Sequence, residues 1–275
     1  MKKIILISCF LFSLTLLSAQ EKVTRTYQLE PFDAINASFV YEMEVFKGDE
    51  YTLELVIPED LAREVEIKVS GKVLNLGITI EWWRTATNVI GKQHTIQARI
   101  TMPDLTAVEL SNAAFLVTRD NFNPANFKVK LSGASGAKVN ILTHAVNVDI
   151  SGASNLEISG LATLAKVYVS GASVLKYNQE TEQIDLEASG ASSVVMRGSS
   201  TKGTFEVSGA SSLKAFEFQM EELDLKCSGA SDTRVYVTGK ISAVAGGASD
   251  IHVKGDPKFS RSVSRGASSI KSIKQ

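Results

Sequence analysis

A four-residue element, Ser-Gly-Ala-Ser, recurs along the second half of the chain and constrains the fold more than any other feature. The first residue of each copy is Ser132, Ser151, Ser170, Ser189, Ser208 or Ser228, and two altered copies begin at Gly246 and Arg265. Successive copies are 18 to 20 residues apart, most often 19. Units repeated at this interval are typical of solenoids, in which each unit buries the apolar face of its neighbour.

Apolar and polar residues alternate on both sides of each element. Apolar Val148 and Ile150 stand three and one residues before one copy, with polar Asp149 between them. The alternation resumes after the element, as Leu156 and Ile158 illustrate. A period of two is typical of a strand with one buried face. We therefore interpret each unit as a strand, a bend, a second strand and a turn.

Strands that recur at equal intervals without intervening helices stack in parallel when the chain winds as a coil. Residues 106–275 are therefore predicted to form a parallel β-helix of about nine rungs, each about 19 residues long. A degenerate earlier rung is visible at Ser111-Asn112-Ala113-Ala114. The chain lacks the six-residue period of left-handed β-helices, which favours a right-handed coil. The predicted fold class is all-β.

The constant and variable positions of the element predict how the bend is oriented. Its glycine, alanine and final serine are the same in all eight copies, whereas the first position admits Gly246 and Arg265 and is predicted to face water. If the alternation continues through the bend, the final serine faces inward. A column of inward hydroxyls could pass hydrogen bonds from rung to rung. The serines of this predicted column are Ser135, Ser154, Ser173, Ser192, Ser211, Ser231, Ser249 and Ser268.

Residues 21–105 carry strand patterns without the repeat and are predicted to form an antiparallel β region that caps the solenoid. Turns containing Gly48 and Gly71 predict two hairpins, which pair residues 39–45 with 51–57 and residues 65–69 with 73–80.

Three further features are expected in the same region. A short helical turn is predicted for residues 58–64, and a strand for residues 94–102. Trp82 and Trp83 would point to opposite faces of a strand. An exposed indole could stack on a sugar, but we favour one core and one surface tryptophan without a ligand.

Residues 1–20 have the features of a secretory signal peptide. Lys2 and Lys3 precede an apolar run from Ile4 to Leu17, and small residues follow at Ser18 and Ala19. The run is shorter than the roughly 20 apolar residues that span a membrane, and no second run of that length follows. The mature protein is expected to be exported through a cleaved signal, to the periplasm or the cell surface, and not to span a membrane.

The number of cysteines and the net charge exclude an internal disulfide and argue against binding to nucleic acid. Cys227 is the only cysteine after residue 20, so no disulfide can form within the mature chain. It stands at a core position of the repeat and is interpreted as a buried apolar side chain. Without Lys2 and Lys3, the mature chain has 27 basic and 30 acidic residues, a net charge of about −3. Nucleic acid is not an expected partner, because its binding requires a basic surface.

The sequence predicts no metal site, no cofactor and no catalytic triad, because His94, His144 and His252 stand at unrelated positions. One outward constellation remains as a candidate ligand face, formed by Tyr168, Asp185, Glu187 and Glu206. Two carboxylates on consecutive rungs would be about 5 Å apart, the separation of a retaining glycosidase pair. The alternative is a solvated charged face.

The opening Pro31-Phe32-Asp33-Ala34-Ile35, the segment 40–45 and the Ser-Gly-Ala-Ser rungs, together with the signal peptide, resemble the bacterial family of putative autotransporter adhesins with a head GIN domain. The resemblance covers roughly residues 30–270. It implies a β-helix, a location in the envelope or outside the cell, and an adhesin role without catalytic residues. The repeats run to Ile270, so a C-terminal membrane barrel is not expected and a periplasmic location remains open.

Three hypotheses of function follow. The first is a non-enzymatic, adhesin-like protein of the bacterial cell envelope, which presents β-helix faces to a polysaccharide or a protein. The second is a polysaccharide lyase or glycosidase that uses the acidic face. The third is a structural periplasmic protein without a ligand. The sequence predicts no oligomeric state.

Overall fold

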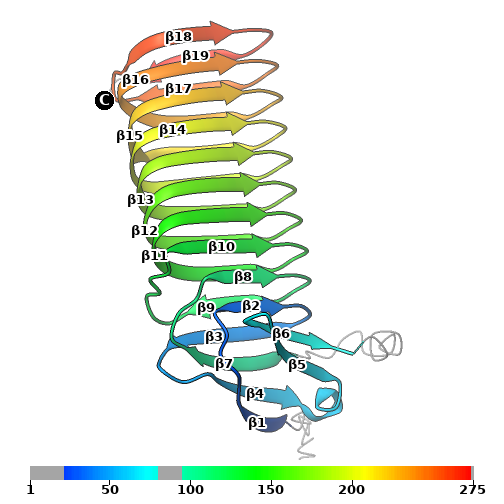
Figure 1. The fold of residues 1–275 in the computed structure, drawn as a ribbon. Helices are drawn as coiled ribbons and strands as arrows, with labels where there is room; N and C mark the ends of the chain where they lie inside the picture. The colour runs from blue at the N-terminus through cyan, green and yellow to red at the C-terminus, as the bar shows by residue number, and fades with distance from the viewer. Residues whose placement is uncertain (1–21, 80–94, 274–275) are drawn as a thin grey trace, which may run out of the picture.

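The computed structural model describes residues 22–79 and 95–273. It confirms an all-β solenoid of about nine turns with rungs of about 19 residues. Figure 1 shows a rod with the N-terminal strands at one end and the strands around residues 258–273 at the other. The chain winds along this rod as a right-handed coil, as predicted (Figure 1).

Six long strands form the middle of the rod, and each runs from one bend to the next. Every strand curves around the edge of the rod that lies opposite the bends (Figure 1). Neighbouring strands pair in parallel with a shift of 19 residues, so that Leu156 pairs with Leu175 and Leu175 with Val194. These strands are β11 (Gly136–Ile150), β12 (Asn155–Val169), β13 (Val174–Ala188), β14 (Ser193–Val207), β15 (Ser212–Cys227) and β16 (Asp232–Ala245).

Shorter strands continue the stack in both directions. Towards the N-terminal end, β8 pairs with β10 and β9 pairs with β11; towards the other end, β16 pairs with β17 and β18, and β17 with β19. Their bounds are β8 (Ala107–Leu110), β9 (Phe115–Thr118), β10 (Asn126–Leu131), β17 (Asp250–Lys254), β18 (Lys258–Ser264) and β19 (Ser269–Ile273). The degenerate rung at residues 111–114 is therefore a turn of the solenoid, as predicted.

The rod has two sheets around one apolar core. We call the sheet formed by the chain before each bend the pre-bend sheet, and the sheet formed after each bend the post-bend sheet. Alternate residues of both sheets are buried, and equivalent positions stack in columns such as Leu156, Leu175, Val194 and Leu213, each 0% exposed. Fully burying a leucine side chain stabilises the fold by roughly 1.5–3 kcal/mol. The alternation predicted from the sequence is thus the basis of the core.

The bend depends on glycine for two reasons. Gly171 has a φ of +72°, in the left-handed region that residues with a Cβ atom rarely adopt. A Cβ on Gly171 would also lie 2.4 Å from the carbonyl oxygen of Gly152 in the preceding turn. The backbone amide of Ala172 donates a hydrogen bond to that same oxygen, at 2.7 Å. The turns can approach this closely only because glycine has no side chain.

The final serine of the element faces inward, as predicted, in the seven bends from Ser135 to Ser249. Ser192 Oγ donates to Ser211 Oγ at 3.1 Å, and the hydroxyls of Ser135 and Ser154 are 3.4 Å apart. Ser173 and Ser249 instead donate to backbone carbonyls, Ser249 to that of Gly246 at 2.8 Å, whereas the buried hydroxyl of Ser231 has no hydrogen-bond partner among the described residues. The predicted ladder of hydroxyls therefore forms in parts of the column and alternates with bonds to the backbone.

In its described residues, 22–79 and 95–105, the N-terminal region contains seven strands and one short 3-10 helix. The helix η1 (Glu59–Leu61) confirms the predicted helical turn, and β7 confirms the strand expected near residues 94–102. The strands are β1 (Lys22–Gln28), β2 (Ala34–Ala37), β3 (Tyr41–Lys47), β4 (Thr52–Pro58), β5 (Val65–Ser70), β6 (Val73–Ile78) and β7 (Ile96–Met102).

One of the two predicted hairpins is confirmed and the other is wrong. β5 and β6 pair antiparallel, as the turn at Gly71 predicted. β3 and β4, which were expected to pair across Gly48, are instead separated by β7, which is parallel to β3 and antiparallel to β4. β1 then pairs antiparallel with β4. The chain between β3 and β4 therefore crosses over a strand that is contributed by residues about 50 positions later.

The strands β2 and β3 form a turn of the solenoid that lies out of sequence order. β2 pairs in parallel with both β6 and β8, and β3 pairs in parallel with both β7 and β9. Ser111 donates its backbone amide to Ala37, so residues 38–40 occupy the position of a bend. Phe39 has a φ of +80° at the place where later turns have glycine. Figure 1 shows this early turn between two later ones.

Several predicted features lie outside the described residues. These are the signal peptide at residues 1–20 and the side chains of Trp82, Trp83 and His94. Among the residues that the structure describes, no helix is long and apolar enough to cross a membrane.

Candidate functional site

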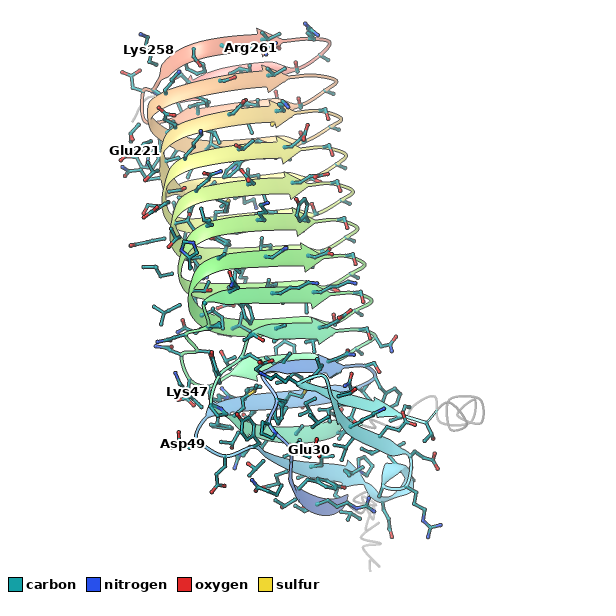
Figure 2. The ribbon with its side chains drawn as sticks, viewed as in Figure 1. Glu30, Lys47, Asp49, Glu221, Lys258 and Arg261 are labelled. Carbon is teal, nitrogen blue, oxygen red and sulfur yellow. The ribbon has the colours of Figure 1, made fainter. Side chains whose placement is uncertain are left out.

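Outward side chains form continuous columns along the rod, because equivalent positions of successive turns are in register. Figure 2 shows such side chains projecting over its length, with Glu221 and Lys258 labelled. Strands in a sheet lie about 4.8 Å apart, so each column repeats a position at that interval. A column therefore presents a regular series of side chains to a ligand.

The predicted ligand face lies on the pre-bend sheet. Tyr168 is in register with Glu187, and Glu187 is in register with Glu206, so the three residues are consecutive members of one column. We call this the Tyr168 column. Asp185 stands two residues before Glu187 on the same strand, in register with Lys166. The predicted adjacency of these four residues is confirmed, whereas a role in binding stays a prediction.

The Tyr168 column combines an exposed aromatic ring with free carboxylates. Tyr168 is 47% exposed. Among the described residues, no other large apolar or aromatic side chain has a larger exposed fraction. Neither Glu187 nor Glu206 forms an ion pair with any described residue, although Lys226 follows Glu206 in register. Towards the N-terminus the same register continues through Asp149 to an ion pair between Lys130 and Glu109, with 3.5 Å between the nitrogen and oxygen.

The post-bend sheet carries a column of different chemistry. Lys138 Nζ lies 2.9 Å from a carboxylate oxygen of Glu157, and Lys176 Nζ lies 3.8 Å from the other oxygen. The hydrogen bond from Lys138 holds the pKa of Glu157 below its ordinary value. Further along, this column becomes mainly basic; its later members are Val195, Lys214, Arg234, His252 and Lys271.

A groove of about 450 Å³ lies on the post-bend sheet at the N-terminal end of the rod. We call it the junction groove, because the strands of the N-terminal region meet the first regular turns here. It crosses β4, β7, β3 and β9, which lie side by side. Its lining consists of Glu42, Met43, Glu44, Glu54, Val56, Gln97, Ala98, Arg99, Phe115, Val117 and Arg119.

Charged side chains in the junction groove hold one another in place. Glu44 accepts hydrogen bonds from Arg119, and it lies 3.6 Å from a guanidinium nitrogen of Arg99. The hydrogen bond from Arg119 lowers the pKa of Glu44, and the charge of Arg99 acts in the same direction. The Arg99 guanidinium also lies over the ring of Phe46, 5.3 Å from its centroid. The two arginines are thus oriented before any ligand arrives.

The remaining candidates for chemistry belong to the scaffold. Cys227 is 4% exposed and donates to Thr233 Oγ1, and burial raises the pKa of its thiol to about 11. This confirms the prediction that Cys227 packs in the core. His252 lies 3.6 Å from Asp232, and His144 is exposed at the curved edge. Across residues 22–79 and 95–273, no group of three or more His, Cys, Asp or Glu side chains is arranged to hold a metal ion.

Sequence reasoning missed the junction groove. Glu44, Arg99 and Arg119 come from three segments that adjoin only because β2 and β3 lie out of order in the stack. The exposed Phe115, next to the degenerate bend at residues 111–114, was the one local signal.

A family model described as "Putative auto-transporter adhesin, head GIN domain" matches residues 31–179 and residues 165–257. These ranges include the early turn, the junction groove and most of the regular turns. No protein among curated sequences matches this chain.

Solved structures of similar fold come from several bacteria. One is described as a putative adhesin from Parabacteroides distasonis; it has a TM-score of 0.65 at 16% identity, and the match covers 92% of this chain and 97% of that chain. Another, described as a putative adhesin from Parabacteroides merdae, has a TM-score of 0.63 at 16% identity, and the match covers 92% of this chain and 96% of that chain. A third, a "putative lipid binding protein" from Parabacteroides distasonis, has a TM-score of 0.65 at 16% identity and covers 92% of this chain and 96% of its own. Identities this low show a shared fold.

Proposed function

Because this chain belongs to the family described as putative auto-transporter adhesin, head GIN domain, we propose that it is a non-enzymatic binding protein of the bacterial cell envelope. In this proposal the rod presents its outward columns to a polysaccharide or to a protein. The signal-peptide features of residues 1–20 support a location in the periplasm or at the cell surface.

The observation that carries the proposal is the Tyr168 column. It places an exposed ring and two carboxylates, those of Glu187 and Glu206, on three successive turns in register. An aromatic ring can pack against the apolar face of a sugar or of a peptide side chain, and carboxylates accept hydrogen bonds from hydroxyl or amide groups. A regular series of positions suits a polymer whose own units repeat.

The same carboxylates are the basis of the enzyme hypothesis, and one experiment separates the two. The mature protein, residues 21–275, is screened against an array of polysaccharides and oligosaccharides, and bound samples are then analysed for cleavage products. We expect binding without product release. Tyr168→Ala should weaken this binding at least tenfold, and the double variant Glu187→Gln, Glu206→Gln should weaken it several-fold.

Lys176→Gln is the matched control, because Lys176 is an outward residue of the same strand as Glu187 but lies on the other sheet, so its replacement should leave binding unchanged. Release of shortened saccharides that is lost in the double glutamine variant would replace the proposal with the enzyme hypothesis. Absence of binding both to the array and to envelope proteins would favour a structural role. Vesicles of bacterial lipids are a useful added sample, since one protein of the same fold is described as lipid binding.

A further inference from the structure

Phe115 is an aromatic side chain that points outward from the post-bend sheet. It is 41% exposed and lines the junction groove. The alternate residues Ala114 and Leu116 are 0% exposed, so the strand already contributes to the core without Phe115. The exposed part of the ring is therefore available to a molecule that enters the groove.

The neighbouring turn leaves a recess that the ring fills. Gly136 is in register with Phe115, and a Cβ on Gly136 would lie 2.7 Å from Cδ2 and 3.0 Å from Cε2 of the ring. The backbone of Gly136 does not have a positive φ, so its conformation does not require glycine. The same position in the next turns is held by residues with side chains, namely Asn155, Val174, Ser193 and Ser212. Gly136 therefore lets the ring lie against the sheet instead of standing away from it.

Hydrogen-bonding groups continue the row of Phe115 into the groove. Glu42 is in register with Phe115, and Gln97 is in register with Glu42. Both side chains are exposed, and neither is hydrogen bonded or ion paired with a described residue. A carboxylate offers acceptors, and an amide offers both donors and an acceptor. The row thus places a ring, a carboxylate and an amide on three adjacent strands.

The second row of the groove supplies donors that are already fixed. Arg99 and Arg119 are both held by Glu44, which leaves guanidinium N–H groups free to bind a ligand. The charges of the three glutamates and two arginines of the lining nearly cancel, so the groove favours neither highly negative nor highly positive ligands. Sugar hydroxyls both donate and accept, and one face of a sugar ring is apolar.

We propose that the junction groove binds an uncharged saccharide unit, with Phe115 as the stacking surface and Glu42 and Gln97 as hydrogen-bonding partners. The volume of about 450 Å³ lies within the range of small-molecule sites and accommodates one or two sugar rings. The site lies on the sheet opposite the Tyr168 column. This inference rests on the proposed binding function and deepens it, because it names the class of ligand.

The test uses the mature protein and an array of uncharged oligosaccharides built from glucose, galactose, mannose and N-acetylglucosamine. The strongest binder is then measured by isothermal titration calorimetry. Phe115→Ala should weaken its binding at least tenfold, and Glu42→Gln and Gln97→Ala should each weaken it several-fold. Gly136→Ser should weaken binding with the ring still present, because the hydroxymethyl group displaces the ring while serine is accepted at this position in other turns.

Two results would overturn the proposal. One is unchanged binding of the uncharged oligosaccharide by Phe115→Ala and Gly136→Ser variants that have the circular dichroism and melting temperature of the wild type. The other is absence of binding to every uncharged saccharide tested. Tyr168→Ala distinguishes the two sites: a loss confined to this variant would reject the groove and retain the proposed function, whereas a loss confined to Phe115→Ala would retain the groove.

Discussion

The glycine of each bend meets a steric limit set by the turn before it. Gly190 has a φ of +76°, and a Cβ at this residue would lie 2.6 Å from the carbonyl oxygen of Gly171. The left-handed conformation alone costs a residue with a Cβ about 1–2 kcal/mol, and the contact adds to this. We expect Gly190→Ala to lower the free energy of unfolding by about 2–4 kcal/mol in urea denaturation.

Ala191 provides the control for this change, because it lies in the same bend and is exposed. Ala191→Ser should alter the free energy of unfolding by less than about 0.5 kcal/mol. Equal stability of Gly190→Ala and the wild type would show that the bend can move away from its neighbour, against the close stacking described above.

The inward hydroxyls make a separate contribution. Ser192 Oγ donates to Ser211 Oγ inside the rod, where water cannot replace the lost bond. Ser192→Val should lower the free energy of unfolding by about 1–3 kcal/mol and leave any ligand binding unchanged. Thermal denaturation followed by circular dichroism measures the effect. Ser193→Val, at the adjacent partly exposed position, should have little effect; an unchanged melting temperature for Ser192→Val would contradict a stabilising hydroxyl ladder.

At the scale of the strand, the spacing of the repeats shows where the stack is irregular. The bends at Ser208 and Ser228 are 20 residues apart, one more than the usual interval. The pairing of β14 with β15 shifts between Val195 and Arg197, and Phe216 is the half-exposed residue that interrupts the alternation of β15. The extra residue is therefore absorbed as a β-bulge, which leaves the buried faces on either side aligned.

Deleting Phe216 should accordingly be tolerated. The deletion restores the 19-residue interval and leaves buried Ala215, exposed Glu217 and buried Phe218 in alternation. We expect a melting temperature close to that of the wild type. Deleting Lys214 shortens the same strand equally, but it makes Leu213 and Ala215 adjacent and turns one of them out of the core. This control should lose roughly 2–3 kcal/mol or more, and equal stability of the two deletions would argue against the bulge.

The regular turns could be predicted from the sequence because each residue pairs with the residue about 19 positions later. The same register allowed the Tyr168 column to be predicted from spacing alone. The pairing of β3 could not be predicted in this way, because its partners β7 and β9 lie about 50 and 70 residues later and share no repeat with it. A glycine-containing turn between two strand patterns predicts a hairpin locally, and here tertiary pairing with β7 overrides it.

The junction groove could not be predicted for the same reason. Its residues stand on strands whose order in the sheet differs from their order in the chain. The alternation does show that Glu42, Glu44 and Phe115 point outward, but it does not show that they are neighbours. Only the parallel pairing of β3 with β9 establishes that.

For the whole molecule, the turn formed by β2 and β3 joins the N-terminal region to the repeats. It is held on both sides, between β6 and β7 on one side and β8 and β9 on the other. Its buried residues belong to the same core cluster as those of the regular turns. We therefore expect residues 22–48 to remain bound after the chain is cut in the exposed turn at Asp49, which Figure 2 shows at the surface.

A protease site inserted between Asp49 and Glu50 tests this expectation. After cleavage, the two pieces should elute together in gel filtration and separate only in a denaturant. A matched site inserted at Gly71 and Lys72, also in an exposed turn, reports whether cleavage as such destabilises the region. Release of the small piece under native conditions would indicate that β2 and β3 are a peripheral layer.

The position of this early turn also separates the order of synthesis from the order of assembly. The strands β2 and β3 emerge early, yet β2 lacks its second neighbour until Leu110 has been made, and β3 lacks its second neighbour until Thr118 has been made. Pairings so distant in sequence form slowly, because long loops must close before their contacts stabilise them. The regular turns that follow can instead add one after another on a template. We therefore expect completion of the N-terminal end to be the slow step in folding. Until it is complete, the first strands stay accessible to any protein that binds the unfolded chain.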